Sequence, residues 1–234
     1  MTTDIESLAR KLEELGQGLV KCARGCPGIV CDRTSGRIPR CLYFETDCRL
    51  GGRGVAVVGL NPGRSSPEEQ QYYLARNCTY GSVVAWFRES GRKQGLNHPY
   101  YRHLRKLVDE LGLTGPILWT ELAKCENATE TAGLPPLQTF RTCTGAFLQR
   151  ELEMLPRDWP LFGVGAEAYK GLAYRFPNHT VIGVPHPTGS RGQFPALSEN
   201  GRLREAVAAE ARGVLAGSGR ALWLTHGGGG ECGA

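Results

Sequence analysis

The sequence predicts an α/β protein, a three-layer α/β/α sandwich around a central, mostly parallel sheet of four strands. Short apolar runs rich in β-branched residues recur along the chain, and each is followed by a polar or glycine-containing loop. Such runs are typical of strands buried on both faces of a parallel sheet. Segments with helical spacing of apolar residues separate the runs, and this alternation indicates helices on both faces of the sheet.

The first expected strand begins at Val55 and ends in the loop Gly59-Leu-Asn-Pro-Gly63. Pro62 stiffens this turn, and Gly63 permits a close backbone approach or a positive φ. Ligands of open α/β sheets bind at the carboxyl ends of strands, so the loops after the strands are where chemistry is expected. The other expected strands are 116–123, 160–165 and 180–185.

Helices are expected before, between and after these strands. Thr3 and Glu6 have capping-box spacing, and leucines at helical intervals follow them. Asn77 to Gly81 is expected to be a turn that carries an aromatic residue, followed by a short apolar element. The remaining helices are expected to start at Pro67, to cover 104–111 and end near Gly112, to cover 136–155, to begin after Gly165, and to cover 203–215.

Length and composition indicate one domain, residues 1–220, followed by a disordered glycine-rich tail, residues 221–234. Hydrophobic residues make up 41% and charged residues 22% of the chain, as in ordinary soluble proteins. No long apolar segment and no signal-peptide pattern occurs, so we expect a cytoplasmic protein with no membrane partner. The net charge of +5 permits a polyanionic partner without requiring one.

Nine cysteines are many for such a protein. Their odd number, without a sign of secretion, argues against a disulfide framework and leaves free thiols or a metal site. Five of them precede the first strand in a segment with little helix or strand signal, and a metal or cluster would supply the reason for such a segment to be ordered. Unrelated buried thiols are the alternative. The five are Cys22, Cys26, Cys31, Cys41 and Cys48.

Two strand ends carry paired motifs: Gly59-Leu-Asn-Pro-Gly63 after the first strand and His186-Pro-Thr-Gly189 after the last. In this order and at this separation, the motifs resemble those of the uracil-DNA glycosylase superfamily. The resemblance runs from about residue 22 to residue 215. It implies that Asn61 positions the attacking water and that His186 donates a hydrogen bond to the oxyanion developing on the base. It also implies that Gly59 and Leu60 contact the substrate.

Tyr80-Gly81 resembles the aromatic-glycine stretch of the single-strand-selective branch of this superfamily. That resemblance implies that Tyr80 stacks on a base flipped out of the DNA. Plain packing of Tyr80 in the core is the alternative. In the loops that follow the two motifs, Arg64, Ser190 and Arg191 are expected to contact DNA.

The cysteines resemble another branch, the iron–sulfur glycosylases. Lys124-Cys125 at the end of the second strand and Cys143 in the following helix match two ligands of the [4Fe–4S] cluster of that branch. The other two ligands form an N-terminal Cys-x-x-Cys pair, whose nearest counterpart here is Cys22 with Cys26, one residue longer. The alternatives that stay open for this pair are Cys31, Cys41 and Cys48.

Glu121 stands where the iron–sulfur branch has an asparagine that hydrogen-bonds the uracil edge. An ionised carboxylate can accept from uracil N3–H but cannot donate to O4. Burial could keep Glu121 protonated, so that it donates. Alternatively, the side chain turns away and Asn127 or another group reads the base. As a weaker alternative, Glu121 selects a deaminated purine that presents N–H donors.

The sequence therefore predicts a monomeric, monofunctional DNA glycosylase of base excision repair. Its expected substrate is DNA that contains uracil or another deaminated base, and its expected cofactor is a [4Fe–4S] cluster. A different class of function stays open on the same fold, namely a non-catalytic protein that binds damaged or single-stranded DNA.

Overall fold

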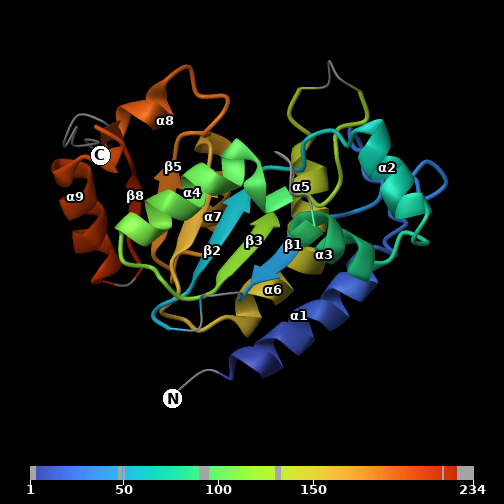
Figure 1. Cartoon of the computed structure of the whole chain (residues 1–234), viewed down its shortest axis with the longest axis horizontal. Helices are drawn as coiled ribbons and strands as arrows, with labels where there is room; N and C mark the ends of the chain where they lie inside the picture. The colour runs from blue at the N-terminus through green and yellow to red at the C-terminus, as the bar shows by residue number, and fades with distance from the viewer. Residues whose placement is uncertain are drawn as a thin grey trace. The chain divides into compact units, whose positions relative to one another are not determined.

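The computed structural model describes residues 4–46, 49, 51–89, 95–129, 133–217 and 219–225, and within them the chain is a mixed α/β protein (Figure 1). The central sheet has the strand order β1-β3-β2-β4-β5-β8 and is mostly parallel. Its strands are β1 Leu42–Glu45, β2 Val55–Gly59, β3 Ile117–Glu121, β4 Leu161–Val164, β5 Val181–Val184 and β8 Ala221–Trp223. The short strands β6 (Ser198–Glu199) and β7 (Arg202–Leu203) form a separate antiparallel pair.

All four expected strands form, but the sheet has six strands, so the prediction of four is wrong. The two that were missed are the strands at the ends of the sheet order, β1 and β8. Strand β1 lies in the cysteine-containing segment, which has little helix or strand signal, and β8 has only three residues, too few for an apolar period to stand out. Strand β8 uses residues 221–223, which were assigned to the tail, and pairs with β5 from Val181 to Gly183. Residues 226–234 lie outside the described part of the chain.

The expected helices form, with local caps that explain where they start. Asp4 accepts a hydrogen bond from the Ser7 amide at the start of α1, and Ser66 caps α2 with Pro67 in its first turn. Thr3 lies outside the described residues. The helix expected over 136–155 consists of α5, a π-helical turn over 144–148, and α6. The helices are α1 Ile5–Leu19, α2 Pro67–Leu74, α3 Tyr80–Glu89, α4 Pro99–Glu110, α5 Leu137–Cys143, α6 Gln149–Met154, α7 Ala166–Arg175, α8 Gln193–Ala196 and α9 Glu205–Leu215.

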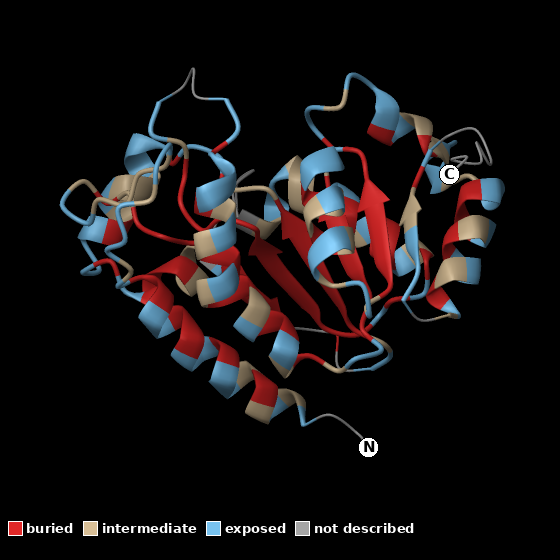
Figure 2. Cartoon of the chain, turned by 180° about the vertical axis from the view of Figure 1, so that it is seen from behind, coloured by how far each residue is buried: buried red, intermediate tan, exposed pale blue. Residues whose placement is uncertain are grey.

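The chain forms two compact units, which are described separately. The first consists of Met1–Glu45, Gly59–Asn97 and Leu118–Pro156. In it, α1 packs on α3, α6 and β1 (Figure 1) through a stripe of buried leucines, each of which stabilises the fold by about 1.5–3 kcal/mol. Figure 2 shows strands β1 to β5 as buried and the outer sides of the helices as exposed. The buried leucines of α1 are Leu8, Leu12, Leu15 and Leu19.

The second unit consists of Thr46–Val58, His98–Ile117 and Arg157–Ala234. Here α7 packs closely on β4 and β5. Gly163 makes this approach possible, because a Cβ there would lie 2.6 Å from the Tyr169 Cα atom. Within the described residues of the whole chain, no helix is long and apolar enough to cross a membrane.

Candidate functional site

The loop that follows β2 is held to the chain that follows β3. The backbone carbonyls of Gly59 and Leu60 accept hydrogen bonds from the amides of Leu122 and Ala123, each at 3.0 Å. Leu60 is half-buried and so lies partly open to solvent, while the Gly59 backbone is buried. The two residues expected to contact a substrate are therefore fixed by backbone hydrogen bonds.

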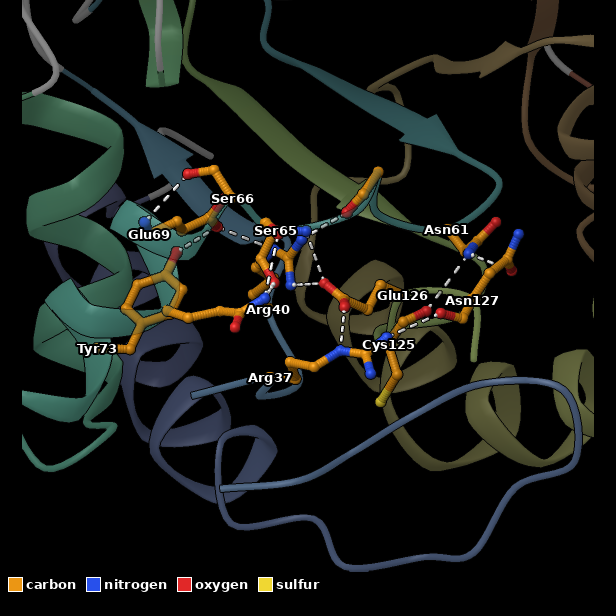
Figure 3. A network of polar contacts seen from close by, with 12 residues as sticks. Arg37, Arg40, Asn61, Ser65, Ser66, Glu69, Tyr73, Cys125, Glu126 and Asn127 are labelled. Atoms are coloured by element: carbon orange, nitrogen blue, oxygen red, sulfur yellow. Dashed lines mark hydrogen bonds and ion pairs between the residues drawn. The ribbon is translucent and has the colours of Figure 1, made fainter. Parts of the chain in front are cut away.

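Asn61 is half-buried and is held through its side-chain nitrogen (Figure 3). Its Nδ2 donates to Asn127 Oδ1 at 3.0 Å and to the backbone carbonyl of Cys125 at 3.4 Å. Among the described residues, no hydrogen-bond donor reaches its Oδ1. Asn61 thus presents a carbonyl oxygen that can accept a hydrogen bond from a water or a ligand.

A buried carboxylate, Glu126, fixes the rest of this loop (Figure 3). It accepts from Arg37 Nε at 2.5 Å, from an Arg40 nitrogen at 2.9 Å and from the Ser65 amide at 2.8 Å. Arg40 also donates to the carbonyl of Gly63, so Arg40 and Glu126 together hold Gly63 and Ser65 of this loop. Burial raises the pKa of Glu126, but Arg40, Ser65 and Arg37 together lower it by more than burial raises it. The net pKa therefore lies below the usual range, and the carboxylate stays ionised.

Glu121, the last residue of β3, is buried with its carboxyl group against Gly59. A Cβ on Gly59 would lie 2.1 Å from Glu121 Oε2, so only glycine leaves room for this carboxyl group. Oε2 has no hydrogen-bond partner among the described residues. Burial raises the pKa of Glu121 to about 8, against the opposing charges of Lys124 and Arg40. Near neutral pH the group is therefore a carboxylic acid, which can donate a hydrogen bond.

This raised pKa predicts a pH-dependent stability. The folded pKa of about 8 exceeds the unfolded value of 4.5, so the stabilisation is complete below pH 4.5 and is lost as pH rises through about 8. Between these values, the free energy of unfolding should fall by about 1.4 kcal/mol per pH unit. Urea unfolding at pH 5, 6.5 and 8 measures this slope, and Glu121→Gln should flatten it. An equal slope in both proteins would show that Glu121 ionises normally.

Beside Glu121, the buried Lys124 joins β3 to the helices that follow it. Its Nζ pairs with Glu151 of α6 at 2.8 Å and contacts Thr120. Its backbone amide donates to Cys143 Sγ at 3.2 Å. The end of β3, the thiol of α5 and the carboxylate of α6 are therefore fixed relative to one another.

The N-terminal cysteine segment runs along the stretch that carries Cys125. Val30 donates its amide to the Glu126 carbonyl at 2.9 Å, and Ala128 donates to the Gly28 carbonyl at 3.1 Å. Ile29 forms an antiparallel bridge with Asn127. This pairing explains how thiols about a hundred residues apart in sequence come together.

Five thiols gather at this place. Cys125 donates a hydrogen bond to the Cys31 side chain, and Cys31 donates to the Cys22 carbonyl at 2.8 Å. The Cys31 hydrogen bond, burial and neighbouring thiols all raise the pKa of Cys125. Cys31, one of the alternatives left open by the sequence, is thus the N-terminal thiol that bonds Cys125 directly. The five thiols are Cys22, Cys26, Cys31, Cys125 and Cys143.

The donor set suits an iron–sulfur cluster by its chemistry, since such clusters take thiolate ligands. No three His, Cys, Asp or Glu side chains of the described residues converge on a single metal ion. In a four-iron cluster each thiolate ligates its own iron, so the ligands of such a cluster do not converge on one ion. Cys41 is no ligand candidate, because its buried thiol lies among Arg40, Glu121 and Lys124 instead of the other thiols. Cys48 lies outside the described residues.

Tyr80 does not have the position expected of a base-stacking residue, and that prediction is wrong. It starts α3 instead of lying in a turn, and it is buried. Its ring covers Gly16 of α1, where a Cβ would lie 2.4 Å from the ring, and its hydroxyl donates to the Leu42 carbonyl at 3.0 Å. Tyr80 therefore packs in the core between α1 and β1.

In the second unit, His186 follows β5 with an exposed side chain whose orientation is fixed. Its Nδ1 accepts from the Thr188 amide at 3.3 Å, and its ring lies 5.2 Å from that of Tyr100. Partial burial, and then the nearby His98, lower the pKa of His186. The imidazole is therefore neutral near pH 7 and carries its proton on Nε2, which can donate to an oxygen. The motif itself does not point to His98 and Tyr100, which lie far from it in sequence.

The three residues expected to contact DNA differ in their surroundings. Arg64 and Arg191 are exposed, as phosphate-binding side chains must be. Arg191 has a φ of 49°, so it sits at a left-handed position of the loop. Ser190 instead accepts a hydrogen bond from the Phe194 amide of α8 at 3.1 Å.

No protein-family model matches the chain, and comparison with curated proteins finds no match.

Proposed function

We propose that the protein is a DNA glycosylase that hydrolyses the N-glycosidic bond of uracil or another deaminated base. The observation that carries this proposal is the state of Asn61, whose carboxamide is held by its nitrogen and presents its oxygen. An oxygen in that position can orient an attacking water without being a strong base. The three-layer arrangement, the monomeric state and a cytoplasmic location expected from the sequence belong to the same proposal.

His186 supports the second half of the chemistry. Breaking the glycosidic bond leaves negative charge on the departing base, and a positioned hydrogen-bond donor stabilises it. A neutral imidazole with its proton on Nε2 is such a donor, because Nδ1 is occupied by the Thr188 amide. Asn61 would therefore serve the water and His186 the leaving base.

The protonation state of Glu121 favours a substrate base that presents a carbonyl oxygen. With its pKa near 8, the carboxylic acid keeps its proton at neutral pH and can donate to an oxygen such as uracil O4. This is the protonated alternative among those that the sequence left open. Asn127 is engaged with Asn61, so it is less suited to reading the base itself.

The chain would hold a [4Fe–4S] cluster through Cys125, Cys143 and two of Cys22, Cys26 and Cys31. Bound there, the cluster would link the N-terminal segment covalently to the end of β3 and to α5. The reaction itself needs none of its electrons, because hydrolysis of a glycosidic bond transfers none.

The test is release of free base from oligonucleotides that each carry one uracil, hypoxanthine, xanthine or mismatched thymine, in single- and double-stranded form. We expect release of uracil at neutral pH, and the unmodified strand is the control. Binding of all these strands without any release would support the other candidate, a damage-binding protein.

A further inference from the structure

We propose that Asn127 is a positioning residue that sets which end of the Asn61 carboxamide faces the reacting water. This inference rests on the proposed function and deepens it. It starts from the pair of side chains at the end of β2 and after β3, which face one another in Figure 3.

The orientation of Asn61 follows from its two partners. The backbone carbonyl of Cys125 can only accept, so the group that points to it must be the Asn61 nitrogen. The second N–H of the same nitrogen then needs another acceptor, which Asn127 supplies with Oδ1 at 3.0 Å. The Asn61 oxygen is thereby turned away from both partners.

The reverse orientation would fail in two ways. With the Asn127 oxygen where it lies, it would place the Asn61 oxygen against two acceptor oxygens, which repel it and leave both hydrogen bonds unmade. It would also turn an NH₂ group toward the water, and this group can only donate. A water that attacks carbon must direct a lone pair at the carbon while one of its O–H groups donates a hydrogen bond to the protein. Only the orientation set by Asn127 and Cys125 meets that need.

Asn127 is itself held firmly. Its backbone carbonyl accepts from Arg37 at 3.2 Å, and its backbone bridges to Ile29. The preceding residue is the buried Glu126, fixed by Arg37 and Arg40. The side chain that orients Asn61 is thus carried by the same backbone that the N-terminal cysteine segment covers.

The test compares Asn127→Leu, which removes the acceptor, with Asn127→Asp, which keeps it. Asn178→Leu, in an exposed turn between α7 and β5, is the matched control. We expect Asn127→Leu to lower the single-turnover rate of uracil release about tenfold to a hundredfold, with unchanged DNA affinity. Asn127→Asp should stay within about threefold of the unmodified protein, because a carboxylate also accepts from Asn61.

A second readout needs no activity. The side-chain amide protons of Asn61, assigned by their loss in Asn61→Asp, should exchange slowly with solvent in the unmodified protein and in Asn127→Asp. They should exchange rapidly in Asn127→Leu. The inference would be overturned if the rate of uracil release and the exchange of the Asn61 amide protons were the same in all variants. It would also be overturned if Asn127→Asp folded but lost both the release of uracil and the slow exchange. Failure of the unmodified protein to release any base would overturn the proposed function, while the exchange measurement would still decide the role of Asn127.

Discussion

Asn61→Ala and His186→Ala should each lower single-turnover cleavage of uracil-containing DNA by about two orders of magnitude or more. That is the usual scale for the loss of one preorganised charge-stabilising group. Asn61→Ala removes the oxygen that would orient the water. His186→Ala removes the neutral imidazole that Thr188 holds with Nε2 available for donation. The rates are measured with enzyme in excess over labelled oligonucleotide.

Binding separates a catalytic effect from a loss of structure. Affinity for the uncleaved strand should survive both substitutions, since phosphate contacts supply most of it. His103→Ala is a suitable control, because this exposed histidine lies in the same unit as His186 and stacks on Phe194. If either main variant cleaves at the rate of the unmodified protein, the role given to that residue is wrong.

The second large effect concerns the thiols. Anaerobically prepared protein should be brown, with broad absorption near ~400 nm from thiolate-ligated iron. Single alanine substitutions at Cys22, Cys26, Cys31, Cys125 and Cys143 should bleach it in four cases of five. Cys125→Ala and Cys143→Ala should be among the four, and both should loosen the N-terminal segment, which proteolysis would detect.

The fifth substitution identifies the thiol that is not a ligand. We expect it to be Cys22 or Cys26, because Cys31 hydrogen-bonds Cys125 directly. Cys78→Ala is the control and should keep the colour, since this thiol lies apart and contacts the Arg33 carbonyl. A colourless, iron-free protein from anaerobic preparation would end the cluster proposal.

Local patterns predicted the inner strands and the site loop correctly. The runs that became β2, β3, β4 and β5 are short, apolar and bounded by glycine or proline, so they could be read directly. Strands β1 and β8 depend on pairing at the ends of the sheet order, which no local pattern records. Tyr80 was misread for a similar reason, because its partner Gly16 lies in a helix more than sixty residues away.

The sequence names the residues of the proposed site, but not the side chains that hold them in place. Motif spacing pointed to Asn61 and His186, yet the side chains that orient them, Asn127 and Thr188, are identified by contacts. The state of Glu121 followed from chemistry only as a choice between alternatives. Its burial against Gly59 favours the protonated form, and burial is a property of the folded chain.

The most direct test of the proposed hydrolysis of the N-glycosidic bond is to run the reaction in water enriched in ¹⁸O and to analyse both products by mass spectrometry. A hydrolytic glycosylase releases uracil without label and leaves one ¹⁸O on the sugar of the abasic site. We predict this pattern for the unmodified protein and its loss in Asn61→Ala and His186→Ala. Bound oligonucleotide that keeps its uracil and gains no ¹⁸O would contradict it.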